Sequence, residues 1–215
     1  MSMHRAVALV TFSIAAAFGG LVLTRHVIAI AGEADAERLN RSILEYVAQK
    51  NPQAPISAFR RFPETLLREA QRTNIDHCLA LAQAEVESEF KHDAVGAAGE
   101  IGLFQIKPST AALLERIAGP FRRPGMGKGG RDLGDLADPA TSTRFAMAYL
   151  RDIMTRRPTI REALTEYNGG PSGRHDHYYR MVMGAYVEVL ERQELRCRFR
   201  EMPKQIQLIT LLSGS

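Results

Sequence analysis

The chain has 215 residues, of which 45% are hydrophobic and 24% are charged, and its formal net charge is +4. This length and composition suit one globular domain with a sizeable core and exclude an intrinsically disordered chain. Basic residues are scattered, aromatic residues make up 7% and tryptophan is absent, so the basic patch with stacking aromatics that nucleic-acid binders show is missing. We therefore expect no nucleic-acid partner.

The N-terminal segment predicts export. Residues 6–23 form an apolar run without a charge, which is typical of a signal peptide and also near the minimum length for a membrane span. A small-x-small pattern, AIA at 29–31, favours cleavage, although the polar residues at 24–26 separate it from the apolar run. Residues 1–31 are predicted to be a signal peptide or an N-terminal membrane anchor, and the remaining chain is expected outside the cytoplasm.

Helical patterns follow residue 31. Residues 33–50 form an amphipathic leader helix that Asn51-Pro52 ends, and a second helix is predicted to begin near Pro63. A third helix is predicted over residues 75–88, with Asp76 as one candidate N-cap. Before its glutamates this third helix carries only uncharged residues and one histidine on every side, which is the pattern of a helix buried at the centre of a domain.

The second half of the chain also shows no lasting strand pattern. An irregular glycine-containing loop at 91–102 precedes a short helix between residues 108 and 119, and residues 120–134 are predicted to be a mobile surface excursion. Further helices are predicted from residue 138, at 160–167 and at about 177–194. The apolar stripe of the helix that begins at residue 138 consists of Phe145, Ala148, Tyr149, Ile153 and Met154. The fold class is therefore predicted to be all-α.

Two cysteines, Cys78 and Cys197, fit an exported protein. An even count permits a disulfide, which would close a long loop and stabilise the fold by about 4 to 5 kcal/mol. Two separate buried thiols remain an equal alternative. The string HDH at 175–177 hints at a metal, but without a third ligand a solvated loop is the better interpretation, and we predict neither a metal nor a cofactor.

Three glutamates stand close together in EVESEF at 85–90. At about 100° per residue, Glu85 and Glu89 are neighbours on a helix, whereas Glu87 lies roughly 160° to 200° away from them. This geometry separates the three carboxylates but does not choose among them. If the helix is buried on all sides, the pKa of Glu87 would be raised, which suits a neutral acid near neutral pH; the alternative is a solvated glutamate at a helix end.

Several strings together resemble the lytic transglycosylase family, relatives of goose-type lysozymes. They are ALAQAEVESEF, then GEIGLFQIKPSTA, then AYL at 148–150 and TEYNGGPSG, in order across about residues 60–185. The resemblance implies a lysozyme-like helical domain with a central buried catalytic helix at 59–190. A helical leader at 32–58 would precede this domain, and a C-terminal tail at 191–215 would follow it.

The resemblance also implies roles for individual residues. Glu87 falls on the catalytic acid and base, and Tyr167 falls on a tyrosine that holds this glutamate in place. The residues assigned to the saccharide groove are Phe104, Gln105, Tyr167, Asn168 and Tyr178, with Tyr179 as the alternative register for the last. Two structural alternatives stay open, because the Gln105 amide could cap local loop backbone and Tyr167 could be a core aromatic.

The sequence departs from the family pattern at a few places. Serines that often follow the catalytic glutamate are replaced by Gly96, Ala97 and Ala98, so a hydrogen bond to the substrate would be missing or supplied elsewhere. The other departures are Phe104 for Met, Glu166 for Ala and Ser142 for Asn. None of them removes the acid, so activity is still expected.

The expected reaction is cleavage of peptidoglycan between N-acetylmuramic acid and N-acetylglucosamine, giving a 1,6-anhydro end without consuming water. One carboxylate can be enough, because the 2-acetamido group can stabilise the cationic centre and the C6 hydroxyl can attack C1. A hydrolytic muramidase with Glu100 as second carboxylate is one alternative. A non-catalytic cell-wall-binding component of a secretion, conjugation or flagellar machine is another. The expected location is the periplasm, with attachment to the inner membrane if residues 6–23 are retained.

Overall fold

The computed structural model describes residues 32–127, 130–173 and 176–198. The chain divides into two compact units, residues 1–40 and 41–215. In the first unit the described residues, 32–40, are helical. The predicted signal or anchor at 1–31 and most of the predicted tail, residues 199–215, lie outside the described residues. Within the described ranges, no helix is both long enough and apolar enough to cross a membrane.

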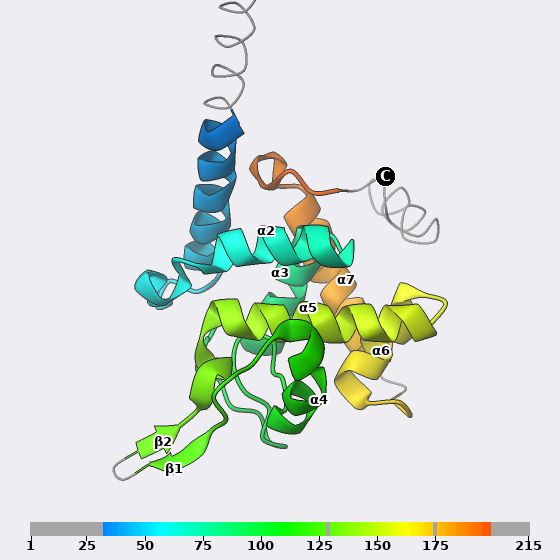
Figure 1. Cartoon of the computed structure of the whole chain (residues 1–215). Coiled ribbons are helices and arrows are strands. Elements are labelled where there is room, and N and C mark those ends of the chain that lie inside the picture. Colours follow the sequence, from blue (N-terminus) through cyan, green and yellow to red (C-terminus); the bar gives the residue numbers. More distant parts are fainter. Residues whose placement is uncertain (1–31, 128–129, 174–175, 199–215) are drawn as a thin grey trace, which may run out of the picture. The chain divides into compact units, whose positions relative to one another are not determined.

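The second unit is built almost entirely of helices, which confirms the all-α prediction (Figure 1). It opens with helical residues 41–50. The α-helices that follow are α2 (Phe62–Thr73), α3 (His77–Ser88), α4 (Pro108–Ala118), α5 (Pro139–Arg156), α6 (Ile160–Gly169) and α7 (Asp176–Leu190). Short 3-10 helices lie at Ile56–Phe59, Gly134–Ala137 and Gln193–Leu195.

One feature differs from the prediction, because the excursion at 120–134 contains a small hairpin. Strands β1 (Gly125–Gly127) and β2 (Gly130–Asp132) pair antiparallel, with Gly125 opposite Asp132. Arg122 closes the base of this hairpin, since its guanidinium binds Asp132 at 2.5 Å and its backbone N–H donates to Asp135. These local ion pairs order a glycine-rich stretch whose sequence shows no strand pattern.

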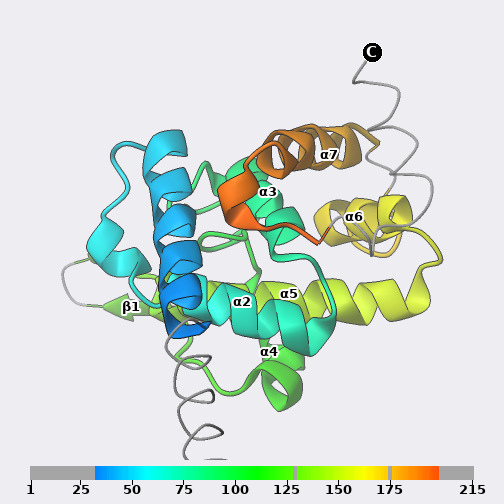
Figure 2. The ribbon, with the colours of Figure 1, turned by 90° about the horizontal axis from the view of Figure 1, so that it is seen from above.

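Helix α3 lies at the centre of the domain, as predicted, and packs against α2 and α7 (Figure 2). It begins at His77 because the Asp76 side chain caps it by accepting a hydrogen bond from the N–H of Cys78 at 3.0 Å. All eight residues from His77 to Ala84 are buried. A helix that is buried all round needs apolar or small residues on every face, and this is what its sequence supplies.

Helix α5 lies between α2 and α4 and packs against both of them (Figure 1). Asp138 caps its first turn by accepting a hydrogen bond from the N–H of Thr141, and proline follows at the first helical position. The fully buried aromatic side chains of the described core are Phe59, Phe62, Phe90, Phe104, Phe145 and Tyr186.

Cys78 and Cys197 form a disulfide, as the first of the two alternatives predicted. The bridge joins the first turn of α3 to a residue 119 positions later, with 5.6 Å between the Cα atoms. Beside it, a ring nitrogen of His77 lies 2.7 Å from the carbonyl oxygen of Leu195. The segment after α7 is thereby fastened to the start of the central helix.

Candidate active site

The end of α3 is fixed by local conformation and by one hydrogen bond. Glu89 and Phe90 adopt left-handed backbone conformations with φ of 51° and 57°, which stops the helix at Ser88. The Ser88 hydroxyl donates to the carbonyl oxygen of Leu103 at 2.8 Å. The last turn of α3, which carries Glu87, is therefore joined directly to the loop that follows it.

The structure chooses among the three glutamates. The Glu85 carboxylate accepts a hydrogen bond from the Tyr46 hydroxyl at 2.5 Å and pairs with Lys50 at 2.7 Å. Glu89 is exposed and pairs with Lys91. Glu87 alone of the three lines a cavity of about 450 Å³. The separation by helical periodicity was correct for Glu85 and Glu87, whereas Glu89 lies beyond the helix end.

The cavity is formed by five parts of the chain. Glu87 comes from the end of α3, Glu100 and Gln105 from the following loop, and Tyr149 from α5. Thr110 from α4 also lines it, and Tyr167 with residues 168–171, at the end of α6 and just after it, completes it. Residues far apart in sequence thus meet around one carboxyl group, in a hollow with the size of a small-ligand pocket.

Glu87 is held from behind by a tyrosine on α7. The Tyr178 hydroxyl donates to Glu87 Oε1 at 2.5 Å, and the Gln83 amide nitrogen donates to the Tyr178 oxygen at 3.3 Å. Burial raises the pKa of Glu87, the Tyr178 hydrogen bond opposes this rise, and the charge of Glu100 adds to it, so that the pKa is raised to about 7. A carboxyl group in this state can both give and take a proton near neutral pH.

The hydrogen bond expected from the Tyr167 hydroxyl to Glu87 is not formed. The Tyr167 hydroxyl donates instead to the backbone carbonyl of Phe104 at 3.0 Å. A phenol has one proton to give, and this buried carbonyl requires a donor. The Tyr167 ring lines the cavity beside Tyr149, with the ring centroids 5.1 Å apart. Tyr178, which was assigned to the groove but does not line the cavity, makes the hydrogen bond to Glu87 that was expected of Tyr167, and Tyr179 lies against Arg161.

Phe104 was predicted to line the groove, and this is also wrong. Its side chain is fully buried in the core. Its backbone has the visible role, because its N–H donates to the Ser142 hydroxyl at 3.2 Å while its carbonyl accepts from Tyr167. Ser142, a departure from the family pattern, therefore supplies a polar anchor for the loop from within α5.

Gln105 lines the cavity as predicted and also serves the local backbone. Its amide nitrogen donates to the carbonyl oxygens of Gly102 at 2.8 Å and Ala94 at 3.3 Å. Its own backbone is left-handed, with φ of 48°. A Cβ atom at Gly96 would lie 2.7 Å from the Gln105 side-chain oxygen and 2.5 Å from Glu100 Oε2. Glycine at 96, in place of the expected serine, therefore leaves room for both side chains.

Glu100 is the second carboxyl group of the cavity. Its Oε2 accepts a hydrogen bond from the N–H of Ala98 at 3.0 Å, and its Oε1 lies 3.3 Å from the Lys107 ammonium. Burial raises the pKa of Glu100, but the backbone donors and Lys107 outweigh burial and hold this pKa below its usual value. The two carboxyl groups therefore have pKa values displaced in opposite directions, which is how acid and base roles are commonly divided.

Asn168 is exposed and lines the cavity, as expected. Tyr149, Lys107 and Pro171 also line it and were not predicted to do so. Tyr149 was assigned to the apolar stripe of its helix, and the AYL string at 148–150 was the only signal in the sequence for another role. Lys107 and Pro171 lie within the strings that carry the family resemblance, but no role was assigned to either residue.

One group of metal-ligand atoms occurs among the described residues, namely Asp76, His77 and Cys78. The Cys78 sulfur is bonded to Cys197, and both Asp76 oxygens accept hydrogen bonds, from the N–H of Cys78 and from the Tyr186 hydroxyl. The disulfide and these two hydrogen bonds explain why the three residues lie together.

Comparison with known proteins agrees with the site. Residues 64–180, more than half of the chain, match the family model of the Transglycosylase SLT domain. The chain belongs to this family. Comparison with curated proteins finds no significant match.

Two solved structures illustrate the likeness. An inactive mutant of the lytic transglycosylase Slt from Pseudomonas aeruginosa is 22% identical, with a TM-score of 0.50 over 71% of this chain and 28% of that chain. The 70 kDa soluble lytic transglycosylase from Escherichia coli is also 22% identical, with a TM-score of 0.44 over 74% of this chain and 27% of that one. The chain thus spans less than a third of each, and the first of them shows that the fold is shared.

Proposed function

We propose that this protein is a lytic transglycosylase that cleaves peptidoglycan between N-acetylmuramic acid and N-acetylglucosamine. The observation that carries the proposal is Glu87, whose raised pKa and place in the cavity suit a general acid. Membership of the SLT transglycosylase family supports the same reaction and the same substrate class.

In the proposed reaction Glu87 gives its proton to the glycosidic oxygen as the bond to C1 breaks. The developing positive charge at C1 is stabilised by the neighbouring 2-acetamido group of the sugar. Glu87, now a carboxylate, takes the proton from the C6 hydroxyl as that oxygen bonds to C1. The product is a 1,6-anhydro end, and Glu87 returns to its protonated state without consuming water.

Neighbouring residues have positioning roles in this scheme. Tyr178 fixes the orientation of the Glu87 carboxyl and stabilises it while it is charged, because its hydroxyl donates to Oε1. The nitrogen of the Gln105 amide is occupied by loop carbonyls. Its oxygen is therefore the atom we assign to a hydroxyl or acetamido N–H of the saccharide.

A hydrolytic muramidase is the second candidate, and Glu100 is the observation that favours it. This carboxylate lines the same cavity and its pKa is held low, so it would be ionised when Glu87 is protonated. Such a pair suits an acid and a base that activates water. The products distinguish the two reactions, since hydrolysis leaves a reducing end and transglycosylation leaves an anhydro end.

The cellular setting is proposed from the sequence. Residues 1–31 would export the chain to the periplasm, either as a cleaved signal or as an inner-membrane anchor that includes residues 6–23. The transglycosylase domain would occupy residues 59–190, after a leader at 32–58 and before a tail at 191–215. The enzyme would act alone or with a secretion, conjugation or flagellar machine. A non-catalytic cell-wall-binding component of such a machine is the competing alternative.

Mass spectrometry of the sugars released from purified peptidoglycan tests the reaction. We expect anhydro-muropeptides from the parent and at least about a hundredfold less from Glu87→Gln, which loses general acid–base catalysis. Glu85→Gln is the matched control, since this residue lies on the same helix and is occupied by Tyr46 and Lys50. Reducing-end products would favour the hydrolase, and no release from the parent would favour the binding role.

A further inference from the structure

A buried carboxylate lies one residue before the cavity-lining Tyr167. The side chain of Glu166 is only 3% exposed. An ionised carboxylate in this position is costly unless it is paired. Arg156 donates to its Oε1 at 2.5 Å, and the Nε of Arg157 donates to its Oε2. The pKa of Glu166 is raised by burial but lowered further by the two arginines, so that it lies below its usual value and the group is an anion.

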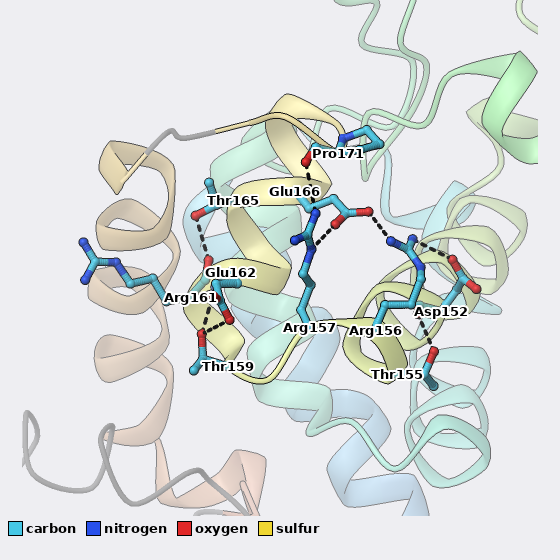
Figure 3. Close-up of polar contacts among 10 residues, drawn as sticks. All are labelled: Asp152, Thr155, Arg156, Arg157, Thr159, Arg161, Glu162, Thr165, Glu166 and Pro171. Carbon is cyan, nitrogen blue, oxygen red and sulfur yellow. Dashed lines mark hydrogen bonds and ion pairs between the residues drawn. The ribbon is translucent and has the colours of Figure 1, made fainter.

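The two arginines differ in what else they bind. Arg156 uses its other terminal nitrogen to bind Asp152, on its own helix α5, at 2.9 Å. Arg157 donates through its Nη2 to the backbone carbonyl of Pro171 at 3.0 Å. Figure 3 shows the Arg157 guanidinium between the Glu166 carboxylate and Pro171. Arg157 alone of the pair therefore connects Glu166 to the segment after α6.

That segment is one wall of the proposed active site. Residues 168–171, here called the 168–171 wall, all line the cavity that contains Glu87. Glu166 holds the wall a second time through its backbone, because its carbonyl accepts from the N–H of Gly170 at 2.7 Å. Gly170 has a φ of +72°, so the chain turns sharply at this point.

Packing alone gives Pro171, the last residue of the wall, little support. Pro171 is exposed, and it borders a second hollow of about 730 Å³, lined by Arg157 and Glu166 among others. Pro171 therefore has a hollow on both sides and few van der Waals partners to hold it. Directed hydrogen bonds must then fix its position, and the rigid planar fork of an arginine holds a carboxylate and a carbonyl at set angles, whereas the rotatable ammonium of a lysine imposes no such geometry.

We propose that the Glu166–Arg157 pair is a positioning device that holds the 168–171 wall in the shape that binds the saccharide. The inference rests on the proposed function of the cavity. The pair does not touch the reacting atoms, so it acts on substrate affinity rather than on the chemical step. Arg156 neutralises the same carboxylate without reaching the wall, and it therefore has no such role.

Arg157→Lys and Arg156→Lys form a matched pair for the test. Initial rates on soluble, uncrosslinked glycan strands give KM and kcat. Hydrogen exchange gives the protection of the Gly170 amide, which donates to Glu166, and of the Gly173 amide, which donates to the Gly170 carbonyl at 2.8 Å. In Arg157→Lys we expect KM to rise about tenfold with kcat within about twofold, and the two amides to exchange faster. In Arg156→Lys all of these should stay within about twofold of the parent.

Two results would overturn the inference: an unchanged KM in Arg157→Lys, or an equal rise in KM in both variants, which would indicate a general loss of stability. Glu166→Gln supplies a second route, since it keeps an acceptor oxygen but weakens the charge-assisted bond, and it should raise KM in the same direction. If the parent cleaves nothing, the proposed function fails instead. Hydrogen exchange then tests the inference by itself, and it overturns the inference if the Gly170 and Gly173 amides are equally protected in Arg157→Lys and Arg156→Lys.

Discussion

The Tyr178 hydroxyl donates a hydrogen bond to Glu87 Oε1 across 2.5 Å, joining α7 to the end of α3. Gln83, one turn earlier on α3, donates to the same phenol oxygen. Because the Tyr178 oxygen accepts a hydrogen bond from Gln83, the Tyr178 proton points to Glu87. This arrangement favours the carboxylate, whereas burial of Glu87 favours the neutral acid, and burial is the larger of the two effects.

The balance at Glu87 predicts the pH dependence of activity. A general acid must be protonated, so kcat/KM should fall as the pH rises through the pKa of about 7. Tyr178→Phe removes the hydrogen bond that lowers this pKa, and the alkaline limb should therefore move upward by about one pH unit, with about tenfold lower activity. Tyr179→Phe is the control, since this neighbour lies against Arg161 instead. An unmoved limb in Tyr178→Phe would contradict the assignment of Glu87 as the acid.

The same pKa predicts how stability depends on pH. Folding raises the pKa of Glu87 from 4.5 to about 7, so the folded state holds a proton that the unfolded state has lost. The stabilisation this provides is full below pH 4.5 and is lost as the pH rises to about 7. Glutamine does not titrate, so the stability of Glu87→Gln relative to the parent should increase by about 3 kcal/mol between pH 4 and pH 8. Urea denaturation at both pH values measures this difference, and a constant difference would refute the raised pKa.

Two glycines of the cavity loop provide a matched steric test. Gly99 and Gly102 share a φ of +83°, but a Cβ atom at Gly102 would lie 2.0 Å from the carbonyl oxygen of Leu136, whereas one at Gly99 would meet nothing within 4 Å. Gly99→Ala should cost about 1 to 2 kcal/mol from backbone strain alone. Gly102→Ala should lower the free energy of unfolding by at least about 2 kcal/mol more than Gly99→Ala, because the backbone at Leu136 or at residue 102 must move to admit the Cβ atom. Equal losses in chemical denaturation would show that the loop does not pack on Leu136 as described.

The disulfide between Cys78 and Cys197 predicts a large effect on stability. It closes a loop with a sequence separation of 119 residues, which corresponds to about 4 to 5 kcal/mol in the chain-entropy model. Replacing both cysteines by alanine should lower the free energy of unfolding by about this amount. A reducing agent should destabilise the parent to a similar extent and leave the double variant unchanged. A parent insensitive to reduction would show that the bridge does not contribute.

The central helix that carries Glu87 could be predicted from the sequence, because the burial of a helix shows in the composition of a short stretch of residues. The stretch from His77 to Ala84 lacks charge on every side, so it had to be a central helix, and the 3.6-residue period separated Glu87 from Glu85. The backbone of this helix needs no distant partner to form, since its hydrogen bonds are internal. Identifying Glu87 as the acid nevertheless required the family resemblance as well as the pattern.

Contacts between elements far apart in the chain were decided only by tertiary packing. Tyr167 and Tyr178 are both tyrosines near the same carboxyl group, yet Tyr167 serves the Phe104 carbonyl and Tyr178 serves Glu87. Which hydroxyl reaches which oxygen depends on how α7 packs against α3 and how α6 lies against the loop that contains Phe104, and no local period records that. The same holds for Glu166, whose burial next to Arg157 follows from the turn between α5 and α6. The sequence alone determined the helices, because these follow from local patterns, and it indicated the candidate acid through the family resemblance added to those patterns. Only the tertiary structure decided the partners of that acid and the support of its cavity wall, since these depend on distances that the whole fold sets.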